Sequence, residues 1–211
     1  MLQLNSALVA IAAEFTGKYA PYQAVEISPC PTGGVFVAST DKGSIACLAF
    51  DPGGRADETA RILPDNELIK VCRGIKTADR ELRIEGTNAI VTTYRKSTNE
   101  RKELTISRSI SEFPPLAQAI DACIRRWGET PEISATAGRY DAHYVERALK
   151  GVSTLGDSVV LSAYDGGPLR IHNQANDVIV LVMPQTAEAI PSVPEWLSEY
   201  AKAGELIAVS R

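Results

Sequence analysis

A helix followed by three short strands occurs three times along this 211-residue chain, and this repeated order constrains the fold more than any other feature. The copies lie near residues 4–50, 64–107 and 141–183. They do not match one another residue by residue, so the repeat rests on the order of elements and on the apolar stripe of each helix. Antiparallel sheets with helices on one face, an α+β architecture, are the expected result.

The third copy carries the strongest pattern. Val145, Leu149 and Val152 recur at helical spacing, so residues 141–152 are predicted to form a helix with Asp141 as its N-cap. Apolar runs at 158–164, 169–173 and 178–183 alternate with turns rich in Gly, Pro, Asn and Asp. This alternation is typical of a three-stranded antiparallel meander.

The first two copies follow the same order. Residues 4–15 show an apolar stripe from Leu4 to Phe15 and a small, uncharged opposite side, which predicts an amphipathic helix. In the second copy Pro64 stands where the first turn of a helix tolerates proline. The predicted strands are 23–28, 35–39 and 44–50 in the first copy, and 59–63, 81–85, 88–94 and 102–107 around the second helix, with a polar, mobile loop at 95–101.

Three segments lie outside the copies. A helix is predicted at 116–127, because Leu116, Ile120, Cys123 and Trp127 share one side. A strand is expected at 132–137. The 27 residues from 185 to 211 are expected to form a loop to 193, a short helix to about 203 and a strand at 205–209.

Composition narrows the function classes. The chain is 45% hydrophobic with a net charge of −4, which suits a soluble globular protein and argues against general attraction to nucleic acid while allowing a local basic surface. Its apolar runs are too short for a membrane span, and the N-terminus lacks a basic signal-peptide region. Four cysteines without CxxC spacing predict reduced core thiols, no metal site and a cytoplasmic location.

Basic residues recur on the open sides of the predicted helices, where they can present positive charge to a partner. The set is Lys70, Arg73, Lys76, Arg80, Arg125, Arg126, Arg147 and Lys150. An ordinary solvated helix face gives the same pattern, and arginines near a helix C-terminus can simply complement the helix dipole.

Catalytic constellations are hard to find in the sequence. The only two histidines, His143 and His172, fall on different predicted elements. Asp41 and Asp165 lie in glycine-containing turns, where aspartate favours the turn backbone itself. No base, metal ligand or nucleophile stands beside them in the sequence, so neither an enzyme nor a cofactor is expected.

Four stretches resemble one family. Residues 34–41 resemble a strand that enters an Ala-Thr-Asp-Gly turn, Ile62-Leu63-Pro64 resembles a helix start, and residues 110–114 resemble a Gly-x-Phe-Pro signature. Residues 140–184 give the best match, ending in Met183-Pro184. Together, in this order, they resemble the sliding clamp, the β subunit of bacterial DNA polymerase III. The chain looks like a short, diverged member, such as a phage could encode.

That resemblance implies a non-catalytic, ring-forming protein that surrounds duplex DNA. Its helices would line a basic hole in which the cations named above contact phosphates without reading sequence. Its sheets would join across subunits, which implies a homo-oligomer. An apolar pocket near Met183 and Pro184 would take a peptide from a polymerase or another partner, and Trp196 in the tail would cover that pocket or dimerise.

The layout departs from that of a whole clamp subunit. The resemblance implies a clamp-like domain at 1–110 with two copies, a shortened second one at 111–184 and a C-terminal extension at 185–211. The missing copy and the uncharged first helix keep an alternative open, namely a protein-interaction module that has the clamp fold but no longer binds DNA.

Overall fold

The fold is given by a computed structural model that describes residues 1–75, 77–128, 136–156, 158–163, 165–190, 192 and 194. The helices are α1 (Ser6–Ala13), α2 (Asn66–Cys72), α3 (Leu116–Gly128) and α4 (Ala142–Ser153). The strands are β1 (Leu2–Asn5), β2 (Val25–Pro29), β3 (Val35–Thr40), β4 (Ile45–Asp51), β5 (Arg55–Ala56), β6 (Ala60–Leu63), β7 (Asp79–Glu85), β8 (Asn88–Tyr94), β9 (Asn99–Thr105), β10 (Ser107–Arg108), β11 (Thr136–Arg139), β12 (Val159–Ser162), β13 (Leu169–Asn173), β14 (Val178–Val182) and β15 (Thr186–Ala189).

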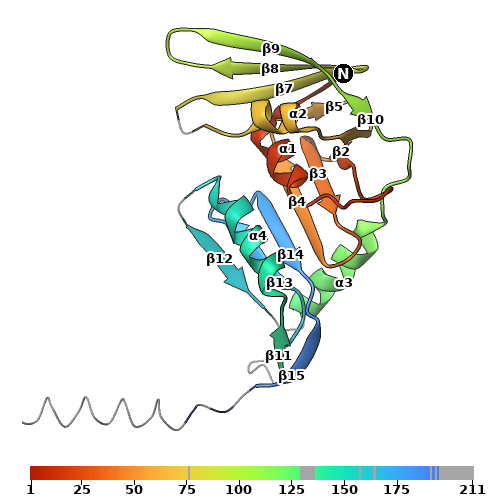
Figure 1. Ribbon diagram of the computed structural model, residues 1–211, viewed down its shortest axis with the longest axis vertical. Coiled ribbons are helices and arrows are strands. Elements are labelled where there is room, and N and C mark those ends of the chain that lie inside the picture. Colours follow the sequence, from red (N-terminus) through yellow and green to blue (C-terminus); the bar gives the residue numbers. More distant parts are fainter. Residues whose placement is uncertain are drawn as a thin grey trace, which may run out of the picture.

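Two antiparallel sheets and a ribbon organise these strands. The larger sheet has eight strands in the order β10-β6-β2-β3-β4-β14-β13-β12, and the smaller has five in the order β5-β1-β7-β8-β9. β11 and β15 form a separate two-stranded ribbon. α2, α1 and α4 lie in a row over the sheets, with α1 in the middle (Figure 1). The predicted α+β class is confirmed.

The three copies are more elaborate than the sequence predicts. Each begins with a strand that leads into the helix, and each ends with a short strand that returns to pair antiparallel with that first strand. The return pairs are β1 with β5, β6 with β10, and β11 with β15. We call these copies unit 1 (residues 2–56), unit 2 (residues 60–108) and unit 3 (residues 136–189).

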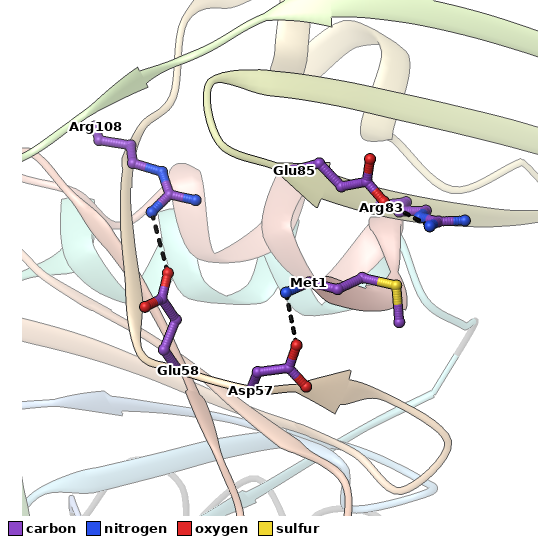
Figure 2. Close-up of polar contacts among 6 residues, drawn as sticks. All are labelled: Met1, Asp57, Glu58, Arg83, Glu85 and Arg108. Carbon is purple, nitrogen blue, oxygen red and sulfur yellow. Dashed lines mark hydrogen bonds and ion pairs between the residues drawn. The ribbon is translucent and has the colours of Figure 1, made fainter.

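Exposed ion pairs lie beside each return pair. The N-terminal ammonium of Met1 contacts Asp57 at 2.8 Å, just past β5, and Arg108 on β10 contacts Glu58 at 3.6 Å, just before β6 (Figure 2). In unit 3, Arg139 on β11 contacts Glu188 on β15 at 3.0 Å. Exposed pairs of this kind contribute about 0–1 kcal/mol each, so they add little to the stability of the return pairs.

Units 1 and 2 exchange their first strands. β1 of unit 1 pairs with β7 of unit 2, and β6 of unit 2 pairs with β2 of unit 1. The exchange builds one continuous hydrophobic core from both units. Within the described residues, β11 of unit 3 pairs only with β15.

Unit 3 joins unit 1 through sheet hydrogen bonding. β14 runs antiparallel to β4, with Val180 opposite Cys47, and this β4–β14 joint continues the eight-stranded sheet across residue 110. The edge of β14 is therefore filled by the same chain. The division at 110 and 111 stays a prediction about domains.

Side-chain caps start the helices of all three units. Asn5 Oδ1 accepts from the Ala7 N–H, and Asp65 and Asp141 do the same for Leu68 and His143. Such a cap contributes about 1 kcal/mol, because it satisfies a free N–H group of the first turn. The prediction for Asp141 is confirmed. Pro64 precedes the cap, so its predicted place inside the first turn was wrong.

The predicted helix at 4–15 was wrong at both ends and in character. Leu2 and Leu4 belong to β1, where they alternate with polar residues, and the helix occupies only Ser6–Ala13. All eight residues of α1 are buried, because α2 packs beside it, the sheets lie below it and Gly151 of α4 faces Phe15 just past its end. The predicted polar loop at 95–101 was also wrong in part, because β9 begins at Asn99.

Most remaining boundaries agree within a few residues of the predicted ones. β13 spans Leu169–Asn173 as predicted, and α3 covers Leu116–Gly128. Residues 186–189 form β15 where a loop was expected, because their polar sequence hides a strand that pairs with β11. The predicted helix from 194 to about 203, apart from its first residue, and the predicted strand at 205–209 lie outside the described residues, as does most of the strand at 132–137. None of the helices described is long and apolar enough to cross a membrane.

Candidate nucleic-acid interface and apolar groove

The row of α2, α1 and α4 forms the helix face, which is the candidate nucleic-acid interface. A cavity of about 400 Å³ opens between these helices. Three cations line it, Arg73, Arg147 and Lys150, together with two carboxylates, Glu14 and Glu146. The structure thus brings cations of the second helix and of α4 together, and it adds acidic residues that the stripe pattern did not include.

Arg147 is partly committed to the protein. Its guanidinium lies 5.6 Å from the ring centroid of Phe15 and donates to the backbone carbonyl of Glu14 and, at 3.4 Å, to that of Thr16. Those carbonyls lie just past the end of α1, so Arg147 fastens α4 to the C-terminal end of α1. Both hydrogen bonds leave from Nη2, whereas the N–H groups of Nε and Nη1 donate to none of the described residues.

Arg73 and Arg80 also make internal contacts. Arg73 forms an exposed ion pair with Glu14 at 3.0 Å. Arg80 donates to the carbonyls of Val71 and Arg73, at 2.9 and 2.7 Å, and so satisfies the C-terminal end of α2. Arg80 is therefore structural where it stands, whereas Arg73 can exchange an exposed carboxylate for a phosphate at low cost.

Lys70 and Lys150 remain as exposed cations of the helix face. Neither forms an ion pair with any residue that the structure describes. Arg125 on α3 is paired with Asp121 one turn earlier at 3.0 Å. Lys76, and the side chain of Arg126, lie outside the part of the chain described.

An apolar groove lies on the other face of the sheet. It has a volume of about 370 Å³ between α3, the β3–β4 turn and the ends of β4 and β14. Ala46 and Leu181 pair in the β4–β14 joint and line this groove. Because side chains alternate along a strand, Ala46 and Leu181 point to the face opposite that of Cys47 and Val180. α3 is thus the one described helix that does not share the helix face.

Met183 lies in this groove and is 44% exposed. Pro184 follows it and is half-buried. Trp196 lies outside the described residues. Leu116, Ile120 and Cys123 of α3 line the opposite wall, so their predicted apolar stripe faces a cavity and is only half-buried. Nothing in the sequence indicated that α3 and Met183 would meet; only the stripe itself was visible.

The histidines and turn aspartates singled out in the sequence lie on separate elements. His143 is exposed on α4, and His172 Nδ1 lies 2.8 Å from the carbonyl of Asn173. Asp41 Oδ1 accepts the N–H groups of Ser44 and Ile45, which confirms its role in the turn. Among the residues described, no cluster of His, Cys, Asp or Glu could hold a metal ion.

The four cysteines are reduced thiols in two environments. Burial raises the pKa of Cys47 and of Cys72 to about 12, in line with the predicted core thiols. Cys30 and Cys123 are only half-buried, so the prediction was wrong for them: Cys30 lies in the β2–β3 turn, 3.2 Å from the Thr32 hydroxyl, and Cys123 faces the groove.

Comparison with solved structures places this arrangement among DNA sliding clamps. The chain is similar to the Proliferating Cellular Nuclear Antigen of Entamoeba histolytica, with a TM-score of 0.53, 12% identity, 88% of this chain covered and 99% of that one. It is similar to the DNA polymerase III β subunit of Pseudomonas aeruginosa, with a TM-score of 0.53 and 10% identity over 87% of this chain and 65% of that one.

A putative β subunit from Eubacterium rectale gives a TM-score of 0.51 at 11% identity, over 86% of this chain and 64% of that one. The chain therefore spans slightly under two thirds of these bacterial β subunits. No protein-family model and no curated protein matches the sequence. At these identities the comparisons establish the fold, which is that of the sliding clamp.

Proposed function

We propose, with the sliding-clamp fold as premise, that this chain is a non-catalytic, clamp-like protein that contacts the phosphates of duplex DNA through its helix face. The observation that carries the proposal is the row formed by α2, α1 and α4, with Lys70 and Lys150 exposed on its two outer helices. Point charges on helices meet phosphates without reading base edges, so binding would be independent of sequence.

The ion pairs of the helix face set the expected strength of this binding. Arg73 is balanced by Glu14, and Arg80 donates to backbone carbonyls. Arg147 has one of its three guanidinium nitrogens on backbone carbonyls, and Glu146 adds a negative charge. Few phosphate contacts remain, and each contributes about 0.9 to the slope of log affinity against log salt. We therefore expect weak binding with a shallow salt dependence.

The test is a salt titration of a short fluorescent duplex between about 50 and 200 mM salt, followed by anisotropy. The variant Lys70→Glu/Lys150→Glu should weaken binding at every salt concentration and lower the slope by about 2, or about 1 for each lysine replaced. Lys96→Glu, an exposed lysine in the β8–β9 turn, is the matched control and should bind like the wild type.

Two results would contradict DNA contact through the helix face. One is the absence of binding at the lowest salt concentration with folded protein. The other is an equal loss of affinity per lysine replaced in the control and in the double variant, which would assign binding to net charge alone.

The apolar groove supports a second candidate function, the docking of a peptide from a polymerase or another protein. Its walls are apolar, and Met183 is open to a ligand. A peptide with one or two large apolar side chains would bury them against Leu181 and Ile120. This function would persist in a protein whose helix face no longer binds DNA.

Peptide docking is separable from DNA binding by substitution. Met183→Glu places a charge in the groove and should abolish binding of a peptide selected from a random library against the wild type, while leaving the DNA titration unchanged. Ile190→Glu, at a residue 54% exposed, is the control for charge and should retain the peptide. A peptide that binds Met183→Glu normally would place its site elsewhere.

A further inference from the structure

Two strand edges of unit 3 have no partner strand among the described residues. In units 1 and 2 the equivalent edges pair with each other. In those units, the first strand pairs on one side with its own return strand and on the other with the first meander strand of the neighbouring unit. In unit 3, β11 has only its return strand β15, and β12 lies at the end of the eight-stranded sheet. No described residue pairs with the second edge of β11 or the outer edge of β12.

The edge of β12 shows what this vacancy exposes. Leu161 lies opposite Ile171, which is fully buried on the core face, yet Leu161 is 50% exposed. Its counterparts are covered: Ile27 on β2 lies between Val37 and Ala60, and is 0% exposed. Val160, on the other face of β12, is 43% exposed. The missing neighbour leaves apolar surface open on both faces of this edge.

The edge strand β9 of the smaller sheet is protected against strand addition by charged side chains, unlike the apolar edge strand β12. β9 ends the five-stranded sheet and carries Glu100, Arg101, Lys102 and Glu103. Charged side chains along an edge discourage another strand from adding to it. β12 carries Val-Val-Leu-Ser, without a charge.

We propose that a second copy of this chain completes unit 3 by reciprocal strand addition, in which β11 of each copy pairs antiparallel with β12 of the other. The template is within the chain itself, since β1 with β7 and β6 with β2 are this same exchange between units 1 and 2. The two unfilled edges of unit 3 complement each other, so one two-fold axis satisfies both at once.

The helices would follow the strands. α1 and α2 pack side by side in the exchanged pair of units, and all of α1 is buried. α4 has α1 as a neighbour, and only Ala148, Gly151 and Val152 among its 12 residues are buried. In the dimer the two α4 helices would pack as α1 and α2 do, covering Leu161 of both copies. The proposal rests on strand pairing and does not depend on DNA binding.

Light scattering on a size-exclusion column tests the proposal. The full chain should elute with the mass of a dimer at micromolar concentration. Leu161→Lys, at a half-exposed position that the monomer tolerates, should shift it to the monomer mass. Ile110→Lys, at a residue 100% exposed outside the three units, is the matched control and should stay dimeric. Circular dichroism confirms that each variant is folded, and Val160→Lys replaces Leu161→Lys if that variant does not fold.

Amide hydrogen exchange identifies the edge that pairs. The amides of residues 159–162 should be protected in the wild type and in Ile110→Lys, and should exchange at least tenfold faster in Leu161→Lys. A monomeric wild type overturns the proposal, including one with protected β12 amides, because a segment of the same chain would then fill the edge. A dimer that keeps its mass in the Leu161 and Val160 variants also overturns it.

Discussion

Unit 1 and unit 3 are built from the same order of elements but bury very different shares of their helices. All eight residues of α1 are buried, against three of the 12 in α4. The local sequence makes both units, because both have a capped helix and a meander with matching turns. Burial of the helix and of the sheet edge depends on the neighbouring unit, because only exchanged strands and a second helix cover them. In this architecture, two units must therefore pair before either one has a fully buried core.

The largest effect expected from this comparison is on core burial. Ile27→Ala in β2 should lower the free energy of unfolding by about 2–5 kcal/mol, because a fully buried side chain leaves a cavity. Leu161→Ala on β12 should cost less than about 1 kcal/mol in dilute protein, because half of that side chain already contacts water. Urea denaturation measures both. Equal losses at low concentration would show that β12 is covered within one chain.

Stability at alkaline pH gives the next largest effect. The folded-state pKa of Cys47 and of Cys72 is about 12, raised from 9, so above pH 9 the unfolded chain releases thiol protons that the folded chain keeps. Their contribution to stability is complete below pH 9 and falls as pH rises towards 12, by up to about 1.4 kcal/mol per pH unit for each thiol.

Urea denaturation between pH 8 and 11 measures this slope. Cys47→Ala removes the thiol in the β4–β14 joint and should reduce the slope, whereas Val37→Ala weakens the same core without removing a thiol and should keep it. An unchanged slope in Cys47→Ala would show that this thiol ionises without cost, which requires a joint that is open in the folded protein.

The contact between α1 and α4 should give an effect of about 1 kcal/mol. A Cβ at Gly151 would lie 2.7 Å from Cζ of Phe15, a ring with no exposed surface. Gly151→Ala should therefore destabilise the protein, because overpacking outweighs the gain of about 1 kcal/mol that alanine brings to a helix. Gly156→Ala, where nothing lies within 4 Å, should change thermal stability little. A stabilised Gly151→Ala variant would mean that α4 packs loosely on unit 1.

The smallest effect is expected at the return pairs. Arg139→Ala removes the exposed ion pair across β11 and β15, and Asp57→Ala removes the one beside β1 and β5. Each should cost less than about 1 kcal/mol and the cost should shrink in high salt. A double-mutant cycle with Glu188→Ala isolates the Arg139 term. A much larger loss in unit 3 than in unit 1 would show that its ribbon depends on this ion pair.

The meanders could be predicted from sequence because their signals are local. β13 was placed correctly since an apolar run sits between clear turns. The alternation of Leu2 and Leu4 also marks a strand, but their spacing extended the stripe of α1 and was assigned to a helix. β5 and β10 have two residues each, too few for any periodicity. The exchange of strands and the β4–β14 joint depend on residues far apart in the sequence, which a local pattern cannot reveal.

In the candidate site, too, local features could be predicted from the sequence and contacts between distant residues could not. That Lys70 and Lys150 lie on exposed helix faces followed from helical spacing. That Glu14 neutralises Arg73, or that Arg147 lies over Phe15, required knowing that the end of α1 lies beside α2 and α4. A stripe of cations predicts which side of a helix is polar. It does not predict which of those cations bind other groups of the same protein.

The β4–β14 joint has a consequence for how the molecule responds to dilution. Its two strands belong to one polypeptide, connected through β10, α3 and β11, so each finds the other at an effective concentration on the order of millimolar. Lowering the protein concentration therefore leaves this contact closed. A contact between separate chains dissociates on dilution. Dilution alone therefore distinguishes an intramolecular strand pair from an intermolecular one.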